Sequence, residues 1–115
     1  MSTYQGSLIH EDYQQLIDKK YIYSNNLSNN QIQPSSIDLT LSEECYEISA
    51  SFLSPYKNIR DDLKDVMIKK ISLDKKYIFE KNKIYLVKLN EEIYLPNNIF
   101  GFCNPKSSTG RLDIF

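Results

Sequence analysis

The sequence predicts a mainly β fold with one short N-terminal helix. About six segments have the length and the apolar or alternating character of strands, and turn residues separate them. Only one segment, Leu8 to Tyr23, places its apolar side chains at helical spacing. The chain has 115 residues, of which 41% are hydrophobic and 25% charged, so it has the composition of one globular domain, residues 1–115, with a single core.

The helix is predicted over about Glu11 to Lys19. Acidic residues stand at its start and Lys19 and Lys20 at its end, which is the order that the helix dipole favours. His10 lies where the chain enters the helix and is interpreted as a capping or surface residue rather than a catalytic base. The polar stretch Ser24 to Asn30 then predicts a loop.

Alternating segments in the first half of the chain predict strands. Ile37 to Leu41 follows Gln33-Pro34 and predicts a half-buried strand with Asp38 on the face opposite its apolar side chains. Asp38 is first assigned a structural role, as a solvated or a paired acid. Cys45 to Phe52 alternates in the same way and predicts another strand. From Ile59 to Ile71 the period is ambiguous between a helix and an irregular extension.

Strand patterns continue in the second half of the chain. Tyr77 to Phe79 and Ile84 to Leu89 flank Glu80 to Lys83, which has the polarity and length of a hairpin loop. Glu91 to Leu95 predicts a further strand. Most of the nine tyrosines fall within such patterns, where an aromatic ring is a normal cross-strand partner.

A turn at Pro96-Asn97-Asn98 leads into the apolar run Ile99 to Cys103, which predicts a buried strand that Pro105 ends. Cys45 and Cys103 are the only cysteines, and both are interpreted as small buried apolar residues rather than as a disulfide. They are also too few for a zinc site.

Charge and hydropathy exclude several classes of function. The net charge is −1, with 14 basic and 15 acidic residues, so no overall field attracts nucleic acid or an anionic membrane. Aromatic and basic residues are not interleaved as in proteins that bind single-stranded nucleic acid. No apolar stretch approaches the ~20 residues of a membrane helix, and the N-terminus lacks the pattern of a secretory leader. We therefore expect a cytoplasmic protein.

The stretch Asn104-Pro105-Lys106-Ser107-Ser108-Thr109-Gly110-Arg111-Leu112-Asp113 carries the strongest candidate site. Ser107 or Ser108 can cap a short helix, and Lys106 and Arg111 add positive charge beside it. These residues predict a phosphate-binding site. An ordinary solvated turn explains the same composition, and the order of residues is not that of a Walker A loop.

This stretch resembles the phosphate-binding motif of the dCTP deaminase branch of the trimeric dUTPase superfamily, which has a basic residue, two serines, two spacers and an arginine. A second stretch, Gln31-Ile32-Gln33-Pro34-Ser35-Ser36-Ile37-Asp38-Leu39-Thr40-Leu41, resembles the opening strand motif of the same family. The resemblance implies a dUTPase-like folded sheet or distorted barrel, of which residues 1–115 form the N-terminal portion.

The resemblance also implies an activity, the hydrolytic deamination of dCTP to dUTP in pyrimidine deoxynucleotide metabolism. In the family a deoxynucleoside triphosphate binds with Mg²⁺ between the subunits of a homotrimer, and a glutamate activates water without zinc. Carried over to this sequence, Lys106, Ser107 and Ser108 would hold phosphate oxygens. Arg111 would bind phosphate and act as the catalytic arginine.

The family continues beyond this motif into the strands that carry the catalytic glutamate, and Glu91 or Glu92 is not expected to replace that residue. The expectation is therefore a truncated dCTP deaminase-like chain with reduced or no activity, which associates into an oligomer through an exposed C-terminal edge. A non-catalytic nucleotide-binding or interaction module is one alternative. The other is half of a split enzyme, completed by a second chain. The residues that read the base lie outside this chain, so dCTP and dUTP both remain candidate ligands.

Overall fold

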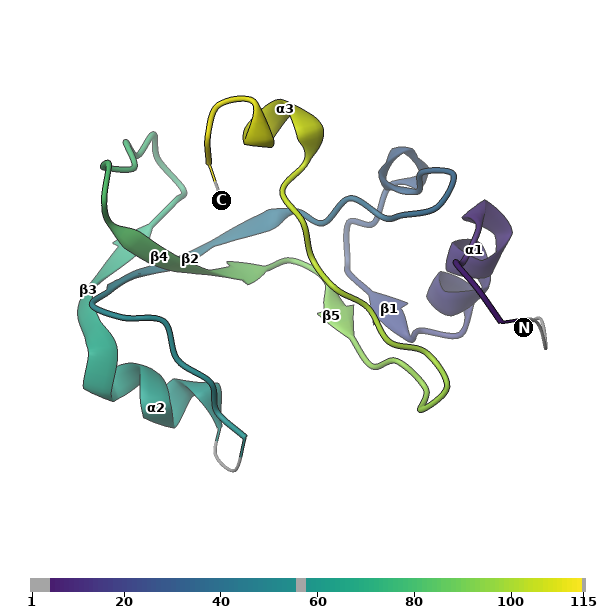
Figure 1. Ribbon diagram of the computed structural model, residues 1–115, viewed down its shortest axis with the longest axis horizontal. Helices are drawn as coiled ribbons and strands as arrows, with labels where there is room; N and C mark the ends of the chain where they lie inside the picture. Colours follow the sequence, from purple (N-terminus) through teal and green to yellow (C-terminus); the bar gives the residue numbers. More distant parts are fainter. Residues whose placement is uncertain (1–4, 56–57, 115) are drawn as a thin grey trace. The chain divides into compact units, whose positions relative to one another are not determined.

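The computed structural model describes residues 5–55 and 58–114, which form two compact units (Figure 1). One unit contains the residues up to Leu39 together with those from Glu91 onward, and the other contains Thr40–Asn90. Each unit has a small antiparallel sheet. The predicted mainly β class with a short N-terminal helix is therefore confirmed, whereas the single-domain organisation of residues 1–115 stays a prediction.

The larger sheet has β2 (Leu41–Ile48) between β3 (Met67–Ser72) and β4 (Ile84–Leu89), with both pairs antiparallel. Cys45 of β2 lies opposite Ile71 of β3 and Val87 of β4, and it is fully buried as predicted. The predicted strand Cys45 to Phe52 is displaced, because the ladders to both neighbours hold β2 in place from Leu41 to Ile48.

The ambiguous segment Ile59 to Ile71 contains both a helix and a strand. Helix α2 (Ile59–Val66) begins at Asn58, whose side chain accepts a hydrogen bond from the Arg60 amide at 2.9 Å, and it runs directly into β3 (Figure 1). The side chain of Leu63, 5% exposed, packs on the sheet in the main core cluster of this unit. The other members of the cluster are Tyr46, Ile48, Phe52, Val66 and Leu86.

The predicted hairpin is wrong. Ile84–Leu89 is strand β4, but it pairs with β2, and residues 77–79 form no strand. Instead the rings of Tyr77 and Phe79 pack edge to face on Tyr85 of β4, with centroids 6.2 and 4.7 Å from it. The eight-residue strand β2 offers β4 a longer ladder than the short apolar run of residues 77–79 could provide.

Glu47 shows why alternation alone misjudged the burial of β2. This strand is central, so Cys45, Tyr46, Glu47 and Ile48 are all buried. The Glu47 carboxylate lies 3.6 Å from the Lys69 ammonium on β3 and 3.3 Å from that of Lys83. A buried acid needs such partners, since an unpaired charge in the interior is costly.

The pH dependence of stability is expected to include a contribution from Glu44. Its carboxylate accepts hydrogen bonds from the Arg60 guanidinium at 2.6 and 3.1 Å and from the Tyr46 hydroxyl at 2.7 Å, and these bonds lower its pKa to about 2. An unfolded glutamate has a pKa of about 4.3. The stabilisation is therefore present above pH ~4.3 and lost as the pH falls through about 2.

Acid unfolding followed by circular dichroism measures this contribution. Glu44→Gln should be less stable than the unmodified chain at neutral pH, and the two should converge towards pH 2. The exposed neighbour Glu43 supplies the control, because Glu43→Gln should keep the acid dependence of the unmodified chain. Identical acid profiles of the unmodified chain and Glu44→Gln would refute the assignment.

The smaller unit begins with helix α1 (His10–Asp18), which confirms the predicted helix to within one residue at each end. The Asp12 carboxylate accepts a hydrogen bond from the Ile9 amide at 3.0 Å, which satisfies a free donor at the helix start. Leu16 is the buried residue of the helix, at 1% exposure. His10 is exposed, so its interpretation as a surface residue is confirmed.

Within the part of this unit that the structure describes, the sheet consists of β1 (Ile22–Tyr23) and β5 (Glu92–Ile93). The predicted strand Glu91 to Leu95 is thus shorter than expected, although the Tyr94 amide still donates to the Tyr21 carbonyl at 2.7 Å. The predicted loop at Ser24 to Asn30 is confirmed except at its end, where the 3₁₀ helix η1 (Asn29–Gln31) begins.

Two strand predictions in this unit are wrong. Of the segment Ile37 to Leu41, only Leu41 lies in a strand, as the first residue of β2. Residues 37–40 contribute one isolated bridge, Ile32 with Ile37, because the chain turns back on itself and the Gln33 amide donates to the Ser36 carbonyl at 2.9 Å. Residues 99–103 follow the confirmed turn at Pro96 but form no strand, since no neighbouring strand within the described residues pairs with them. Cys103 is consequently exposed and not buried, and neither cysteine forms a disulfide.

The described residues contain no helix with the length and apolar character needed to span a membrane.

Candidate phosphate-binding site

The serine motif forms the one-turn helix α3 (Ser107–Gly110), which confirms the predicted short helix. The predicted serine cap is wrong. Lys106 occupies the position before the first turn, and no side chain caps it. Ser107 and Ser108 lie inside the turn with exposed side chains, so their hydroxyls are available to a ligand.

The spacing of the motif places three of its polar side chains along one side of this turn. Arg111 follows α3 with helical backbone angles, φ −65° and ψ −23°, and its amide donates to the Ser107 carbonyl at 3.0 Å. Residues three and four positions apart are neighbours on a helical surface. Ser107 and Ser108 therefore lie on the same side as Arg111. The two spacer residues between Ser108 and Arg111 have a physical reason, because this spacing brings the three side chains together.

Lys106 is held by the other sequence motif. Its ammonium nitrogen lies 3.0 Å from Oδ2 of Asp38, which also accepts a hydrogen bond from Nε2 of Gln33 at 3.2 Å. The Asp38 side chain is 30% exposed and that of Lys106 is 64% exposed. The structure thus favours the interpretation of Asp38 as a paired acid, and it joins the two motifs that the sequence resemblance rests on.

Sequence reasoning missed the glutamines that support this contact. Nε2 of Gln31 donates to the Asp38 carbonyl at 2.9 Å and to Oε1 of Glu91 at 2.8 Å. Glu91 is only 6% exposed and serves here as a partner of Gln31. The signal for these glutamines in the sequence was the alternation of Gln31 and Gln33 with the buried Ile32. This alternation places both side-chain amides on one side of the chain.

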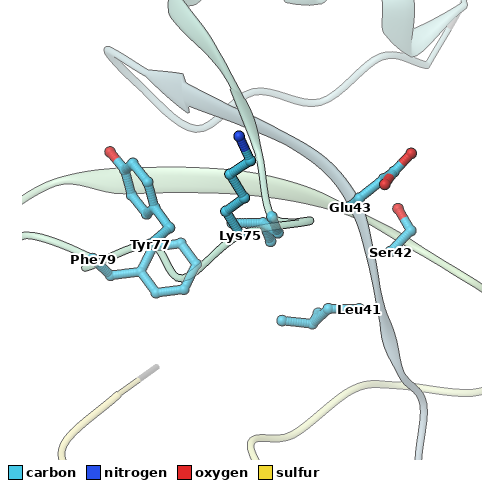
Figure 2. A pocket seen from close by; sticks show the side chains of 7 residues that line it. Leu41, Ser42, Glu43, Lys75, Tyr77 and Phe79 are labelled. Atoms are coloured by element: carbon cyan, nitrogen blue, oxygen red, sulfur yellow. The ribbon is translucent and has the colours of Figure 1, made fainter.

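The hollow shown in Figure 2 lies in the other unit and contains none of the predicted site residues. It is an open depression of about 340 Å³, with Tyr77 and Phe79 on one side, Ser42 and Glu43 on the other and Lys75 between them (Figure 2). Within the described residues no three His, Cys, Asp or Glu side chains are grouped so that they could hold a metal ion. The candidate phosphate-binding site is therefore an exposed surface, formed by the hydroxyl groups of the two serines and by the cationic side chains of Lys106 and Arg111.

The two small sheets, the serine turn and its basic side chains define a mainly β protein of the dUTPase-like class. Residues 4–115 match the family model described as the 2'-deoxycytidine 5'-triphosphate deaminase (DCD) N-terminal domain. The chain belongs to the dCTP deaminase family.

Relatives and a solved structure agree with this assignment. The chain is 31% identical over 101 residues to a protein of Persephonella marina, and 30% identical over 109 residues to one of Methanosphaera stadtmanae. Both are named "dCTP deaminase, dUMP-forming". These matches cover 88% and 90% of this chain but 56% and 54% of the relatives, so the chain spans about half the length of the curated relatives it matches.

The solved structure is the crystal structure of 2'-deoxycytidine 5'-triphosphate deaminase from Agrobacterium tumefaciens. It matches with a TM-score of 0.88 and 35% sequence identity, over 96% of this chain and 34% of that one. The roles of Lys106, Ser107, Ser108 and Arg111 remain predictions.

Proposed function

We propose that residues 1–115 form the N-terminal, triphosphate-binding part of a dCTP deaminase of pyrimidine deoxynucleotide metabolism. One observation carries this proposal: Ser107, Ser108 and Arg111 share one side of an exposed turn, and Lys106 at its start is held by Asp38. Charged donors and hydroxyls in this arrangement suit a polyanion. A deoxynucleoside triphosphate as substrate would place the protein in the cytoplasm.

Each motif residue has a proposed role. Lys106 and the two serine hydroxyls hold phosphate oxygens, and Arg111 binds phosphate and stabilises charge near the reacting centre. Mg²⁺ would arrive bound to the phosphates, because this ion is commonly held by substrate phosphates and few carboxylates. Zinc has no part in the proposed reaction.

Deamination by residues 1–115 alone is expected to be slow or absent. The reaction needs a positioned group that activates water, and such acid–base catalysis typically contributes ~10² to 10⁴ in rate. Glu91 is buried and bound to Gln31, which makes it a poor substitute for the family glutamate. The curated relatives are named dUMP-forming, so an assay should follow both dUTP and dUMP.

The exposed apolar side chains on both sides of the serine motif favour association with another polypeptide. Phe100, Phe102 and Leu112 are 88%, 81% and 73% exposed, and large apolar side chains concentrated in one segment are typical of interaction surfaces. We propose a homo-oligomer, a trimer by family resemblance. A second candidate is half of a split enzyme, in which another chain supplies the glutamate. A third is a non-catalytic module that uses the same surface.

Thermal unfolding with dCTP, dUTP, dTTP and tripolyphosphate, each with Mg²⁺, tests the proposal. A ligand that binds only the folded state at 100 times its Kd stabilises it by about 2.7 kcal/mol. We expect stabilisation by the nucleotides, reduced by Ser107→Ala and unchanged by Ser51→Ala, which removes an exposed hydroxyl from the other unit.

Absence of stabilisation by all four ligands at millimolar concentration would reject nucleotide binding by this chain. Light scattering on the same samples separates the remaining alternatives. A strictly monomeric species would count against the oligomer and leave a partner chain of different sequence as the candidate.

A further inference from the structure

Asp38 is fixed in place more firmly than an ordinary surface acid. Its amide donates to the Gln31 carbonyl at 2.8 Å, and its carbonyl accepts from Nε2 of the same glutamine at 2.9 Å. Its carboxylate accepts from Nε2 of Gln33, which also donates to the Asn30 carbonyl at 3.2 Å. Backbone and carboxylate are therefore both oriented before any ligand is present.

Lys106 has the opposite character. It follows residues 99–105, which form no helix or strand within the described chain, and its long side chain is 64% exposed. When a side chain with many rotamers must be immobilised on binding, the entropy cost lowers the affinity of the site for its ligand. The 3.0 Å contact with Asp38 selects one of these conformations in advance.

We infer that Asp38 is a positioning residue that holds the Lys106 ammonium ready for a phosphate group, while Gln33 orients the carboxylate. An ammonium group has three donor hydrogens, so one bond to Asp38 leaves two for phosphate oxygens. This inference rests on the proposed function, because it assigns a role within the same phosphate-binding site.

A carboxylate near bound phosphate also repels the phosphate, which lowers the affinity, whereas the positioning of Lys106 raises it. The dependence of the affinity on salt concentration distinguishes the two effects. The Debye length falls from about 8 Å at 0.15 M to about 3 Å at 1 M, which screens the repulsion beyond the first contact, whereas the direct hydrogen bond to Lys106 depends less on salt. Affinity for Mg²⁺-tripolyphosphate should therefore be measured at 0.15 M and 0.5 M salt.

Calorimetric titration of the full chain tests the inference. At 0.5 M salt, Asp38→Ala should weaken tripolyphosphate binding roughly twofold to tenfold, the cost of ordering one long side chain on binding. Asp38→Asn should recover most of the affinity, since its amide oxygen can still accept from Lys106. In a Lys106→Ala background, Asp38→Ala should have no further effect.

Asp113→Asn is the matched control. It removes the same charge from the segment that carries the site, and asparagine tolerates the positive φ of 60° at this position. Its affinity at 0.5 M salt should equal that of the unmodified chain.

Four results would overturn the inference. Tighter binding by both Asp38→Ala and Asp38→Asn at 0.5 M salt would mean that the carboxylate competes with phosphate. A loss that persists in the Lys106→Ala background would mean that Asp38 only supports the local fold. Unaltered binding by Asp38→Ala would remove its role and leave the proposed function standing, whereas no binding by the unmodified chain would reject both.

Discussion

Leu63→Ala is expected to lower the free energy of unfolding of the Thr40–Asn90 unit by about 2 to 5 kcal/mol, the range for truncating a buried leucine. Leu63 is 5% exposed and is the buried residue of α2, where it meets Tyr46 and Ile48 of β2. Its removal leaves a cavity between helix and sheet. Because β2 hydrogen-bonds to both β3 and β4, loosening of its face should weaken the whole sheet.

Leu53→Ala provides the control for this experiment. Leu53 belongs to the same unit but is 93% exposed, so its truncation should change the free energy of unfolding by less than about 0.5 kcal/mol. Denaturant titration followed by circular dichroism measures both variants. Equal effects of the two substitutions would contradict the assigned core.

Arg111→Ala is expected to weaken triphosphate binding about tenfold to a hundredfold. A hydrogen bond to a charged group contributes about 1.5–3 kcal/mol, and a guanidinium can make two parallel bonds to one phosphate. Arg111 lies on the same side of the turn as Ser107 and Ser108, so the three side chains can bind one polyanion. Arg111→Lys should be intermediate, because it keeps the charge and loses the planar fork.

Lys81→Ala distinguishes a specific contact from the overall charge. It removes one positive charge from an exposed turn in the other unit and should leave the affinity for dCTP and Mg²⁺ within twofold of the unmodified chain. Calorimetric titration measures the affinity of Arg111→Ala, Arg111→Lys and Lys81→Ala for dCTP and Mg²⁺. Comparable losses in Arg111→Ala and Lys81→Ala would show that Arg111 contributes only to the general field.

The sequence by itself determined the features that depend on neighbouring residues. Helical spacing and end charges located α1, the apolar run Ile84–Leu89 located β4, and the order of residues 104–113 located the short helix α3. The two motifs also indicated the family, which the match over residues 4–115 confirms. Local periodicity, capping and motif order carry this information within one segment of chain.

Only the tertiary structure decided which segments become partners. Local pattern predicted strands at Ile37 and Ile99, but neither segment acquires a continuous ladder in the described residues. Strand β4 pairs with β2 instead of with its neighbour in sequence. Glu47 is buried because β2 is the central strand, and two lysines from elsewhere in the unit serve as its ionic partners.

The contact between Lys106 and Asp38 joins residues 68 positions apart. The sequence assigned Lys106 to a phosphate-binding motif and gave Asp38 a separate structural role, and only the folded chain brings the two residues into contact. Hydrogen bonds and ion pairs of this range depend on where the backbone brings two segments together, and the local pattern of either segment does not contain that information.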